Sequence, residues 1–397
     1  LLANRGYKVD IYERFSRKEI INTYSKRSFN LTFYGYAVEV LKTTGLWEKI
    51  APFFLKLRGS LTQVTKHAKP VFVRFDLDDM TYYTIQRAKL LDILITEVEK
   101  HPLITFHFEQ QLLSIDRYSR TMLVEKLPSK KLETISCDLI IGADGVNSAV
   151  RPFIQQGQET MHKQEYEQWS YKQIILNKSL SQKISLQANT QYTWTRKYAS
   201  LIAFPNGEDA FTAMLILPKN KAKGFDSLQS DEKIASFIHQ QFPQLILALP
   251  EITDAIHNNP EGYLVTVTTN PWYYKDFLVL IGDAAHGCLP FYGIGTSVAF
   301  GDCLELARLL DSKGENLEKV FSLYQERRKK HTDVIAQLAK ESFIGFRRYK
   351  KADPIAVYDR LETILYTVSP KLFTPPLFCL VANNPDHAAD YFKKHEA

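Results

Sequence analysis

The segment that decides the fold covers residues 275–310 and reads KDFLVLIGDAAHGCLPFYGIGTSVAFGDCLELARLL. Its apolar run Phe277–Ile281 predicts a buried strand that ends at a Gly-Asp pair. Further on, Gly293 and Gly295 predict a second turn, which opens a long helix. An acid at the carboxyl end of a parallel strand can bind sugar-like hydroxyl groups, and a helix start stabilises negative charge. Asp283 therefore indicates a site for an extended anionic cofactor, the alternative being an Asp that only caps the turn.

A second turn of similar chemistry lies in residues 137–153, CDLIIGADGVNSAVRPF. A short apolar run leads into Gly142 and Asp144, and a helix is expected to follow. Small residues let the backbone approach a bound group closely, while Asp144 and Arg151 offer an anchor and a positive charge. The alternative is a purely structural turn capped by Asn147.

The beginning of the chain, LLANRGYKVDIYERF, resembles the end of one helix followed by a strand. Gly6 is placed as a left-handed helix cap, and alternating apolar residues lead to Glu13. In a dinucleotide-binding unit, an acid at the end of the second strand binds ribose about 20 residues after a glycine-rich turn. That turn would lie upstream of Leu1. We therefore expect the first strand and the G-x-G-x-x-G turn to be missing from this chain.

Composition narrows the class of protein. With 397 residues, 45% of them hydrophobic, the chain can form two or three domains with a large core. Its four cysteines have neither a disulfide pattern nor a metal spacing, so no metal site is predicted and a reducing, cytoplasmic compartment is favoured. No apolar run approaches the roughly 18 residues of a membrane span. The net charge of +6 is modest, and the basic runs ERRKK and FRRYKK are interpreted as solvated helix faces, with no nucleic-acid partner.

Strand-like and helix-like segments interleave, which is typical of an α/β protein. The stretches starting at Tyr34 and Arg87 have helical periodicity, and residues 103–116 alternate as one strand would. Between Tyr166 and Val267 the segments become long and alternating, which predicts a mostly antiparallel sheet with one helix around DEKIASFIHQQF. From Thr296 onward the pattern is nearly all helical.

The two turn motifs, in this order and about 130 residues apart, resemble those of single-component FAD monooxygenases of the para-hydroxybenzoate hydroxylase type. Similarity along nearly all of the chain is greatest to the kynurenine 3-monooxygenases. The resemblance implies FAD as cofactor, NADPH as a transient reductant, and O2 and a small electron-rich aromatic molecule as substrates, with oxygen transfer through a flavin C4a-hydroperoxide. No side chain of the protein is then expected to act as a nucleophile.

The resemblance also implies a domain division. The FAD-binding domain, Rossmann-like, would comprise residues 1–50, 87–160 and 270–312. A substrate domain with the antiparallel sheet would be inserted as residues 51–86 and 161–269. Residues 313–397 would form a helical region that covers the flavin and the substrate.

Cofactor contacts are carried over position by position. Glu13 would hold the adenosine ribose, Arg87 would face the FAD phosphates, and Asp283 would bind the ribityl chain. Asp144 and Arg151 would belong to a motif associated with both FAD and NADPH. The complete set of expected cofactor-binding residues is Glu13, Arg14, Arg87, Asp144, Asp283, Pro290, Gly293, Gly295, Thr296 and Ser297. Asp144 and Asp283 should lie on opposite sides of one groove.

The substrate side departs from the kynurenine hydroxylase pattern. Arg58 matches the family's carboxylate-binding Arg, but Phe72 and Phe378 replace two Tyr and Ser297 replaces an Asn. Losing these polar partners favours a less polar arene, or an acid placed differently, over kynurenine. The complete set of expected substrate-binding residues is Arg58, Phe72, Trp194, Phe204, Phe211, Pro290, Phe291 and Phe378. For the aromatic residues the alternative is core packing, and for Arg58 it is a surface ion pair.

Two other functions stay open. One is a flavin reductase or halogenase on the same scaffold, although neither Trp169 nor Trp194 lies in the W-x-W-x-I-P segment of such halogenases. The other is a non-catalytic remnant of the fold. Oxygenated product formed during substrate-stimulated NADPH oxidation would separate the three, and the sequence predicts no oligomeric state.

Overall fold

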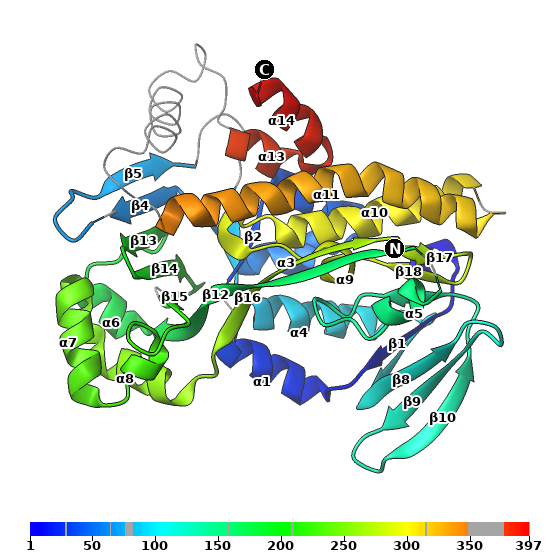
Figure 1. The fold of residues 1–397 in the computed structure, drawn as a ribbon, viewed down its shortest axis with the longest axis horizontal. Coiled ribbons are helices and arrows are strands. Elements are labelled where there is room, and N and C mark those ends of the chain that lie inside the picture. The colour runs from blue at the N-terminus through cyan, green and yellow to red at the C-terminus, as the bar shows by residue number, and fades with distance from the viewer. Residues whose placement is uncertain are drawn as a thin grey trace.

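The computed structural model describes residues 1–27, 30–63, 65–75, 82–157, 159–207, 210–313, 316–347 and 377–396. A few side chains inside these ranges, that of Phe378 among them, are outside the description. Helices and strands alternate along most of the chain (Figure 1). The α/β class predicted from the sequence is confirmed.

The helices of the described residues are α1 (Arg17–Arg27), α2 (Gly35–Thr43), α3 (Trp47–Ile50), α4 (Arg87–Val98), α5 (Arg151–Gln155), α6 (Lys178–Lys183), α7 (Asp231–Gln241), α8 (Leu249–Asn258), α9 (Asp283–His286), α10 (Gly295–Lys313), α11 (Leu317–Arg347), α13 (Leu377–Asn383) and α14 (Ala388–Glu396). Short 3-10 helices are η1 (Ala3–Arg5), η2 (Ala51–Phe53), η4 (Phe225–Ser227), η5 (Pro243–Ala248), η6 (Pro290–Tyr292) and η7 (Pro385–His387).

The strands are β1 (Val9–Glu13), β2 (Leu31–Phe33), β3 (Leu55–Lys56), β4 (Gly59–Gln63), β5 (Val71–Arg74), β6 (Tyr83–Ile85), β7 (Ile104–Phe108), β8 (Gln110–Asp116), β9 (Thr121–Lys126), β10 (Lys131–Ser136), β11 (Ile140–Gly142), β12 (Met161–Leu176), β13 (Thr190–Arg196), β14 (Ala199–Pro205), β15 (Phe211–Pro218), β16 (Gly262–Asn270), β17 (Tyr273–Tyr274) and β18 (Leu278–Leu280).

Two pieces of parallel sheet carry the turns singled out in the sequence. β1 pairs in parallel with β7, and β11 pairs in parallel with β18, which β17 joins on its other side. Leu278, Val279 and Leu280 of β18 are completely buried, because α10 and α11 pack beside them. A continuous apolar run is the usual sequence of such a doubly covered parallel strand.

The largest sheet of the described residues has seven strands in the order β16-β12-β15-β14-β13-β4-β5. Side chains alternate between its two faces. One face packs against α7 and α8 through residues such as Phe211 and Leu215. The other face, with Ile202 and Ile216, packs toward α11 and the segment before α10. The long helices α10 and α11 run side by side across the molecule (Figure 1).

Several predicted elements are divided more finely in the structure. Residues 103–116 form two strands because Glu109 takes a left-handed backbone with φ of 57°. The helix predicted from Tyr34 ends near Gly45, whose φ is 73°, and a separate short helix follows. The antiparallel part also contains α6 and α8 beside the predicted α7. The domain boundaries remain a prediction.

Gly6 closes η1 in a left-handed conformation, with its N–H bonded to the carbonyl oxygen of Ala3, as the sequence predicts. Across the described ranges we find no helix that combines the length and the apolar character needed to cross a membrane.

Candidate flavin-binding site

The turn with Asp144 and the turn with Asp283 follow neighbouring strands, at the same edge of one sheet. β11 and β18 run in parallel with Gly142 opposite Leu280. The N–H of Ile281 also bonds to the carbonyl oxygen of Gly142 at 3.0 Å. Asp144 and Asp283 therefore both follow carboxyl ends of adjacent parallel strands, the position at which α/β sheets bind ligands. Both carboxylates are exposed.

Asp144 caps the turn in front of α5. Its Oδ2 accepts hydrogen bonds from the backbone N–H groups of Ala149 at 2.6 Å and Val150 at 3.2 Å. Asn147, the cap named in the structural alternative, instead uses its Oδ1 to accept hydrogen bonds from Gln164 and Tyr166. The cap of this turn is therefore Asp144 and not Asn147. The contacts of Asp144 fit the structural alternative, and its cofactor role remains a prediction.

Arg151 ties the two turns together. Its guanidinium is buried and donates hydrogen bonds to the carbonyl oxygens of Ala284, at 3.1 Å, and Val146. Burial lowers the pKa of Arg151 from its usual value. The sequence suggested a positive charge offered to a bound group, whereas the guanidinium is directed at the protein backbone. Arg151 therefore links the segment after β11 to the segment after β18.

Asp283 begins α9 with a carboxylate to which no group of the described residues donates a hydrogen bond. Gly282, just before it, has φ of 58°, a conformation that glycine adopts without strain. An exposed carboxylate without a partner can accept hydrogen bonds from the hydroxyl groups of a sugar-like chain. The ribityl chain of FAD carries such hydroxyl groups, so this hydrogen-bond acceptor fits the cofactor.

The glycine turn before α10 brings the backbone close to other groups. Gly293 has φ of 66°, and a Cβ atom on it would lie 2.9 Å from Thr32 Oγ1. Thr32 donates a hydrogen bond to the Gly293 carbonyl oxygen. A side chain at this position would therefore both strain the turn and displace Thr32.

The helix start that follows suits a group carrying negative charge. N–H groups in the first turn of α10 have no acceptors within the helix, and the helix dipole places partial positive charge there. Ser297 is completely buried, and its Oγ has no hydrogen-bond partner among the described residues. Because protein atoms alone cover this hydroxyl, a group bound at the start of α10 would meet backbone N–H groups, and the cofactor role of Ser297 remains a prediction.

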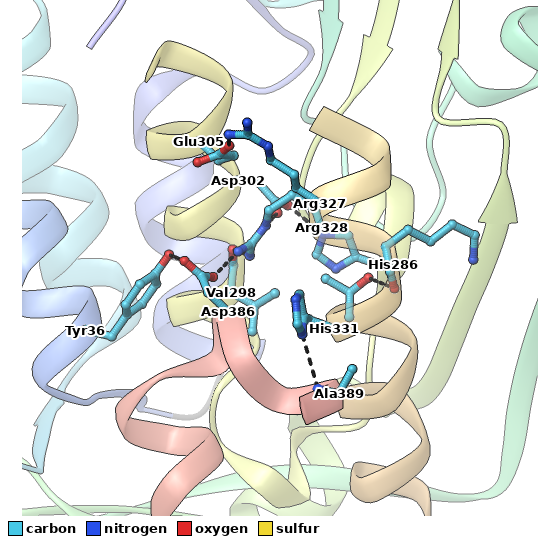
Figure 2. A network of polar contacts seen from close by, with 12 residues as sticks. Tyr36, His286, Val298, Asp302, Glu305, Arg327, Arg328, His331, Asp386 and Ala389 are labelled. Atoms are coloured by element: carbon cyan, nitrogen blue, oxygen red, sulfur yellow. Dashed lines mark hydrogen bonds and ion pairs between the residues drawn. The ribbon is translucent and has the colours of Figure 1, made fainter. Parts of the chain in front are cut away.

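Asp302, a buried acid of α10, forms hydrogen bonds with residues at both ends of the turn that contains Asp283, and Figure 2 shows its contact with His286. Asp302 is completely buried, and its Oδ2 accepts hydrogen bonds from the Gly282 N–H at 2.8 Å and from His286 Nε2 at 2.5 Å. Its Oδ1 accepts one from Arg328 Nε at 2.8 Å. Burial alone would raise the pKa of Asp302, but His286 and Arg328 outweigh it and lower this pKa to about 2. His286 is thus held in place by Asp302 and fixes local structure.

Asp302 is a functional residue that was not predicted, although the sequence carries a signal for it. Val298, Asp302 and Leu306 follow one another at the four-residue spacing of a helix face, and all three are buried. An acid in the middle of such an apolar row needs a buried cation. Arg328 of α11 is that cation, and it is only 2% exposed.

Three more of the expected cofactor-binding residues lie elsewhere in the chain, namely Glu13, Arg14 and Arg87. Glu13 ends β1, as predicted, and its Oε1 accepts a hydrogen bond from the Phe15 N–H at 2.9 Å. Arg14 is exposed, with its guanidinium over the Phe15 ring. Arg87 begins α4. Within the described residues β1 and β18 belong to separate sheets, so this structure does not join Glu13 to the Asp283 turn through one sheet.

Aromatic residues of the expected substrate set lie on two different faces of the large sheet. Phe204 and Phe291 belong to the cluster on the face toward α11, and the Phe291 ring stacks on Phe343 with centroids 4.6 Å apart. Trp194 and Phe211 are buried on the opposite face, against α7 and α8. The structure therefore does not bring the four together. Trp194 and Phe211 have the placement of core side chains, the alternative interpretation of the sequence.

Two of the residues expected to bind a carboxylate lie on neighbouring segments, because Arg58 precedes β4 and Phe72 belongs to β5, which pairs with β4. Arg58 is exposed, and no described group forms an ion pair or hydrogen bond with its guanidinium. Phe72 lies on the edge strand β5, 40% exposed, with its ring against Gly59. Phe378 belongs to α13, but its side chain lies outside the described residues.

Three hydroxyl groups next to the glycine turn were not anticipated from the sequence. A Cβ atom on Gly293 would lie 3.3 Å from Tyr34 Oη and 3.7 Å from Tyr82 Oη, in addition to Thr32. Both tyrosines are buried, and burial raises the pKa of Tyr82 to about 12. The hydroxyl groups of Thr32, Tyr34 and Tyr82 therefore lie next to Gly293.

Comparison with known proteins agrees with a flavin site. The family described as FAD binding domain matches residues 1–339. Kynurenine 3-monooxygenase of Salinispora arenicola is 29% identical over 98% of this chain and 86% of its own length. Kynurenine 3-monooxygenase of Legionella pneumophila strain Corby is 30% identical over 86% of this chain and 76% of its own length.

A solved structure has the same fold. The tetrameric form of 2-methyl-3-hydroxypyridine-5-carboxylic acid oxygenase superposes with a TM-score of 0.71, covering 94% of each chain at 19% sequence identity. The family match spans both Gly-Asp turns and the start of α10. The chain therefore belongs to the FAD binding domain family, as a relative of the kynurenine 3-monooxygenases.

Proposed function

We propose that this chain is an NADPH-dependent flavoprotein monooxygenase that hydroxylates a small, electron-rich aromatic substrate with O2. The observation that carries the proposal is the exposed carboxylate of Asp283, just after β18 and beside the turn after β11, with no hydrogen-bond donor among the described residues. The start of α10 follows in the same segment. Membership in the FAD binding domain family supports the identity of the cofactor.

Asp283 and the segment at the start of α10 would bind different parts of FAD. Asp283 would accept hydrogen bonds from ribityl hydroxyl groups, and the first turn of α10 would stabilise negative charge on the ring system. Gly293, with φ of 66°, would form the turn that sets the position of this helix start. The cofactor supplies the activation of O2, because no amino-acid side chain does so.

The protein's part in the reaction is to orient the arene and exclude water. Phe204 and Phe291 present apolar surface on the face of the sheet toward α11. Apolar walls keep water from the reacting atoms, and water would otherwise divert the oxygen into hydrogen peroxide. The hydroxyl groups of Thr32 and Tyr82 beside Gly293 offer polar contacts to a substituent of the ring.

The substrate we propose is less polar than kynurenine, or carries its acid in a different place. Phe72 and Ser297 stand where kynurenine hydroxylases carry a Tyr and an Asn, and each lost hydrogen bond to a charged group costs about 1.5–3 kcal/mol. Arg58 is the polar partner retained from that pattern. Kynurenine itself is therefore expected to be a poor substrate.

A panel of arenes tests the function. Purified protein loaded with FAD is mixed with NADPH and with kynurenine, anthranilate-like amino acids, phenols and unsubstituted anilines in turn. We expect at least one phenol or aniline to accelerate NADPH oxidation and to yield a product that is heavier by one oxygen atom. A protein that binds FAD and oxidises NADPH at the same slow rate with every arene would contradict the proposal.

A further inference from the structure

Asp302 and Arg328 connect the flavin-binding turn to a distant part of the chain. The Oδ2 atom of Asp302 accepts hydrogen bonds from the N–H of Gly282, the residue before α9, and from the ring of His286, the last of the four residues of α9. Asp283 is the first residue of that helix. Any shift of the Asp302 carboxylate therefore moves the backbone that presents Asp283.

The other oxygen of Asp302 belongs to a chain of contacts that leads outward. Arg328 Nε donates to Asp302 Oδ1 at 2.8 Å, and Nη2 donates to the Val298 carbonyl oxygen at 3.0 Å. The remaining nitrogen, Nη1, donates to Asp386 Oδ1 in η7. Figure 2 shows Arg328 between α10 and the C-terminal segment, in contact with both.

Asp386 lies in the segment Pro385–Ala389, where Ala388 packs into the core and three polar contacts with α2 and α11 are described. Asp386 Oδ2 accepts a hydrogen bond from Tyr36 Oη of α2 at 2.6 Å. One turn of α11 after Arg328, His331 Nδ1 accepts a hydrogen bond from the Ala389 N–H at 3.1 Å. The third contact is the ion pair with Arg328 itself.

We propose that Asp302 and Arg328 are positioning residues that couple the flavin-binding turn to docking of the segment Pro385–Ala389. This inference rests on the proposed function, because it assumes that FAD binds the Asp283 turn. Two charges buried side by side stabilise each other only while every partner is in place. Losing Asp386 leaves Arg328 with an unpaired N–H and frees it to shift, and the shift reaches Gly282 through Asp302.

Thermodynamic linkage makes the coupling reciprocal. FAD on the Asp283 turn stabilises the docked segment to the same extent that the docked segment strengthens FAD binding. A merely structural ion pair between α10 and α11 would stabilise the fold without changing the affinity for FAD. The chain contains such a pair for comparison, Arg327 with Glu305, at 2.7 Å between the same two helices. Neither of its residues contacts the turn or the C-terminal segment in the contacts recorded for the described residues.

The test compares the Asp386→Asn and Glu305→Gln variants with the wild-type protein, each as the full chain. FAD affinity is measured by flavin fluorescence, and hydrogen exchange of residues 385–396 is followed with and without FAD. We expect D386N to raise the dissociation constant of FAD about five-fold or more, the lower end of typical couplings. E305Q should leave it within about two-fold, as expected for an exposed pair. FAD should slow exchange in residues 385–396 of the wild-type protein and not of D386N.

The possible results separate the coupling from the proposed function. Equal FAD affinity in D386N and E305Q, or exchange in residues 385–396 that ignores FAD, overturns the coupling while leaving the proposed function intact. A wild-type protein that binds no FAD overturns the proposed function together with the coupling. Because Asp386 is 33% exposed at its side chain, D386N is expected to fold, and a folded far-ultraviolet spectrum checks this.

Discussion

The guanidinium of Arg151 donates a hydrogen bond to the carbonyl oxygen of Ala284 at 3.1 Å, and so joins the helix after β11 to the helix after β18. Two segments separated by more than a hundred residues are thereby held at one edge of the sheet. The expected cofactor acid Asp283 is the neighbour of Ala284 in the chain, so its position depends on this bond.

Replacing Arg151 by Met should destabilise the protein and weaken FAD binding together. The substitution leaves the carbonyl oxygens of Val146 and Ala284 without this donor, at about 1–3 kcal/mol for a buried unsatisfied group. Urea unfolding and FAD titration measure the two effects. The matched variant Arg327→Met removes an exposed arginine and should cost at most about 1 kcal/mol. Equal unfolding free energies for the two variants would show that the bond to Ala284 is unimportant.

Replacing Asp283 by Asn should weaken FAD binding while leaving stability nearly unchanged. The carboxylate has no donor among the described residues, so the fold loses no contact, whereas FAD loses hydrogen bonds to a charged acceptor. Such bonds contribute about 1.5–3 kcal/mol, which corresponds to roughly a 10- to 150-fold rise in the dissociation constant. Fluorescence titration with FAD measures it. Wild-type affinity in D283N would remove Asp283 from the site.

The stability of the protein should fall as the pH drops from about 6.5 toward 4. Burial, with a smaller contribution from Lys330, lowers the pKa of His331 to about 4 in the folded protein. Between these pH values the unfolded chain binds a proton at His331 and the folded protein does not. The contribution of neutral His331 to stability is therefore fully present above about pH 6.5 and is lost on acidification, by up to roughly 3 kcal/mol. The His331→Gln variant keeps an acceptor for the Ala389 N–H and cannot titrate. The unfolding free energy of H331Q should fall less than that of the wild type between about pH 6.5 and 4. If both fall equally, His331 is not the cause of the pH dependence.

The aromatic residues on the two faces of the large sheet should respond differently to substitution. Phe291→Leu changes the face toward α11 and should raise the KM for an arene or increase release of hydrogen peroxide. Phe211→Leu, on the face covered by α7 and α8, should lower the unfolding free energy by about 1–3 kcal/mol, with KM unchanged in the folded fraction. Steady-state kinetics and urea unfolding of both variants check this. A KM effect in F211L alone would reverse the assignment of the faces.

The parts of the fold that sequence patterns predict are those fixed by local chemistry. The short apolar run before Gly282, bounded by a glycine turn, favours a covered strand, and Gly293 permits a left-handed turn, so both are indicated by the residues themselves. The helix starting at Gly295 follows from the same turn. Glu109 shows the limit, because a non-glycine residue with positive φ gives no warning in the sequence that one strand becomes two.

The parts that sequence patterns leave open depend on which distant segments meet. Trp194 and Phe204 occupy neighbouring strands of similar composition, and only the register of β13 and β14 decides which face each one takes. Arg328 lies in a helix rich in basic residues, and its sequence does not distinguish it from the exposed Arg327. Its burial follows from packing against α10, which brings Asp302 next to it.

Incorporation of labelled oxygen tests the central claim most directly. The FAD-loaded protein is supplied with NADPH and with the arene that best stimulates NADPH oxidation, under ¹⁸O₂, and the product is analysed by mass spectrometry. We predict that a single ¹⁸O atom enters the aromatic ring and that unlabelled oxygen from water does not. NADPH oxidation that yields only labelled hydrogen peroxide, with no oxygenated arene, would contradict the assignment of this chain as an aromatic hydroxylase.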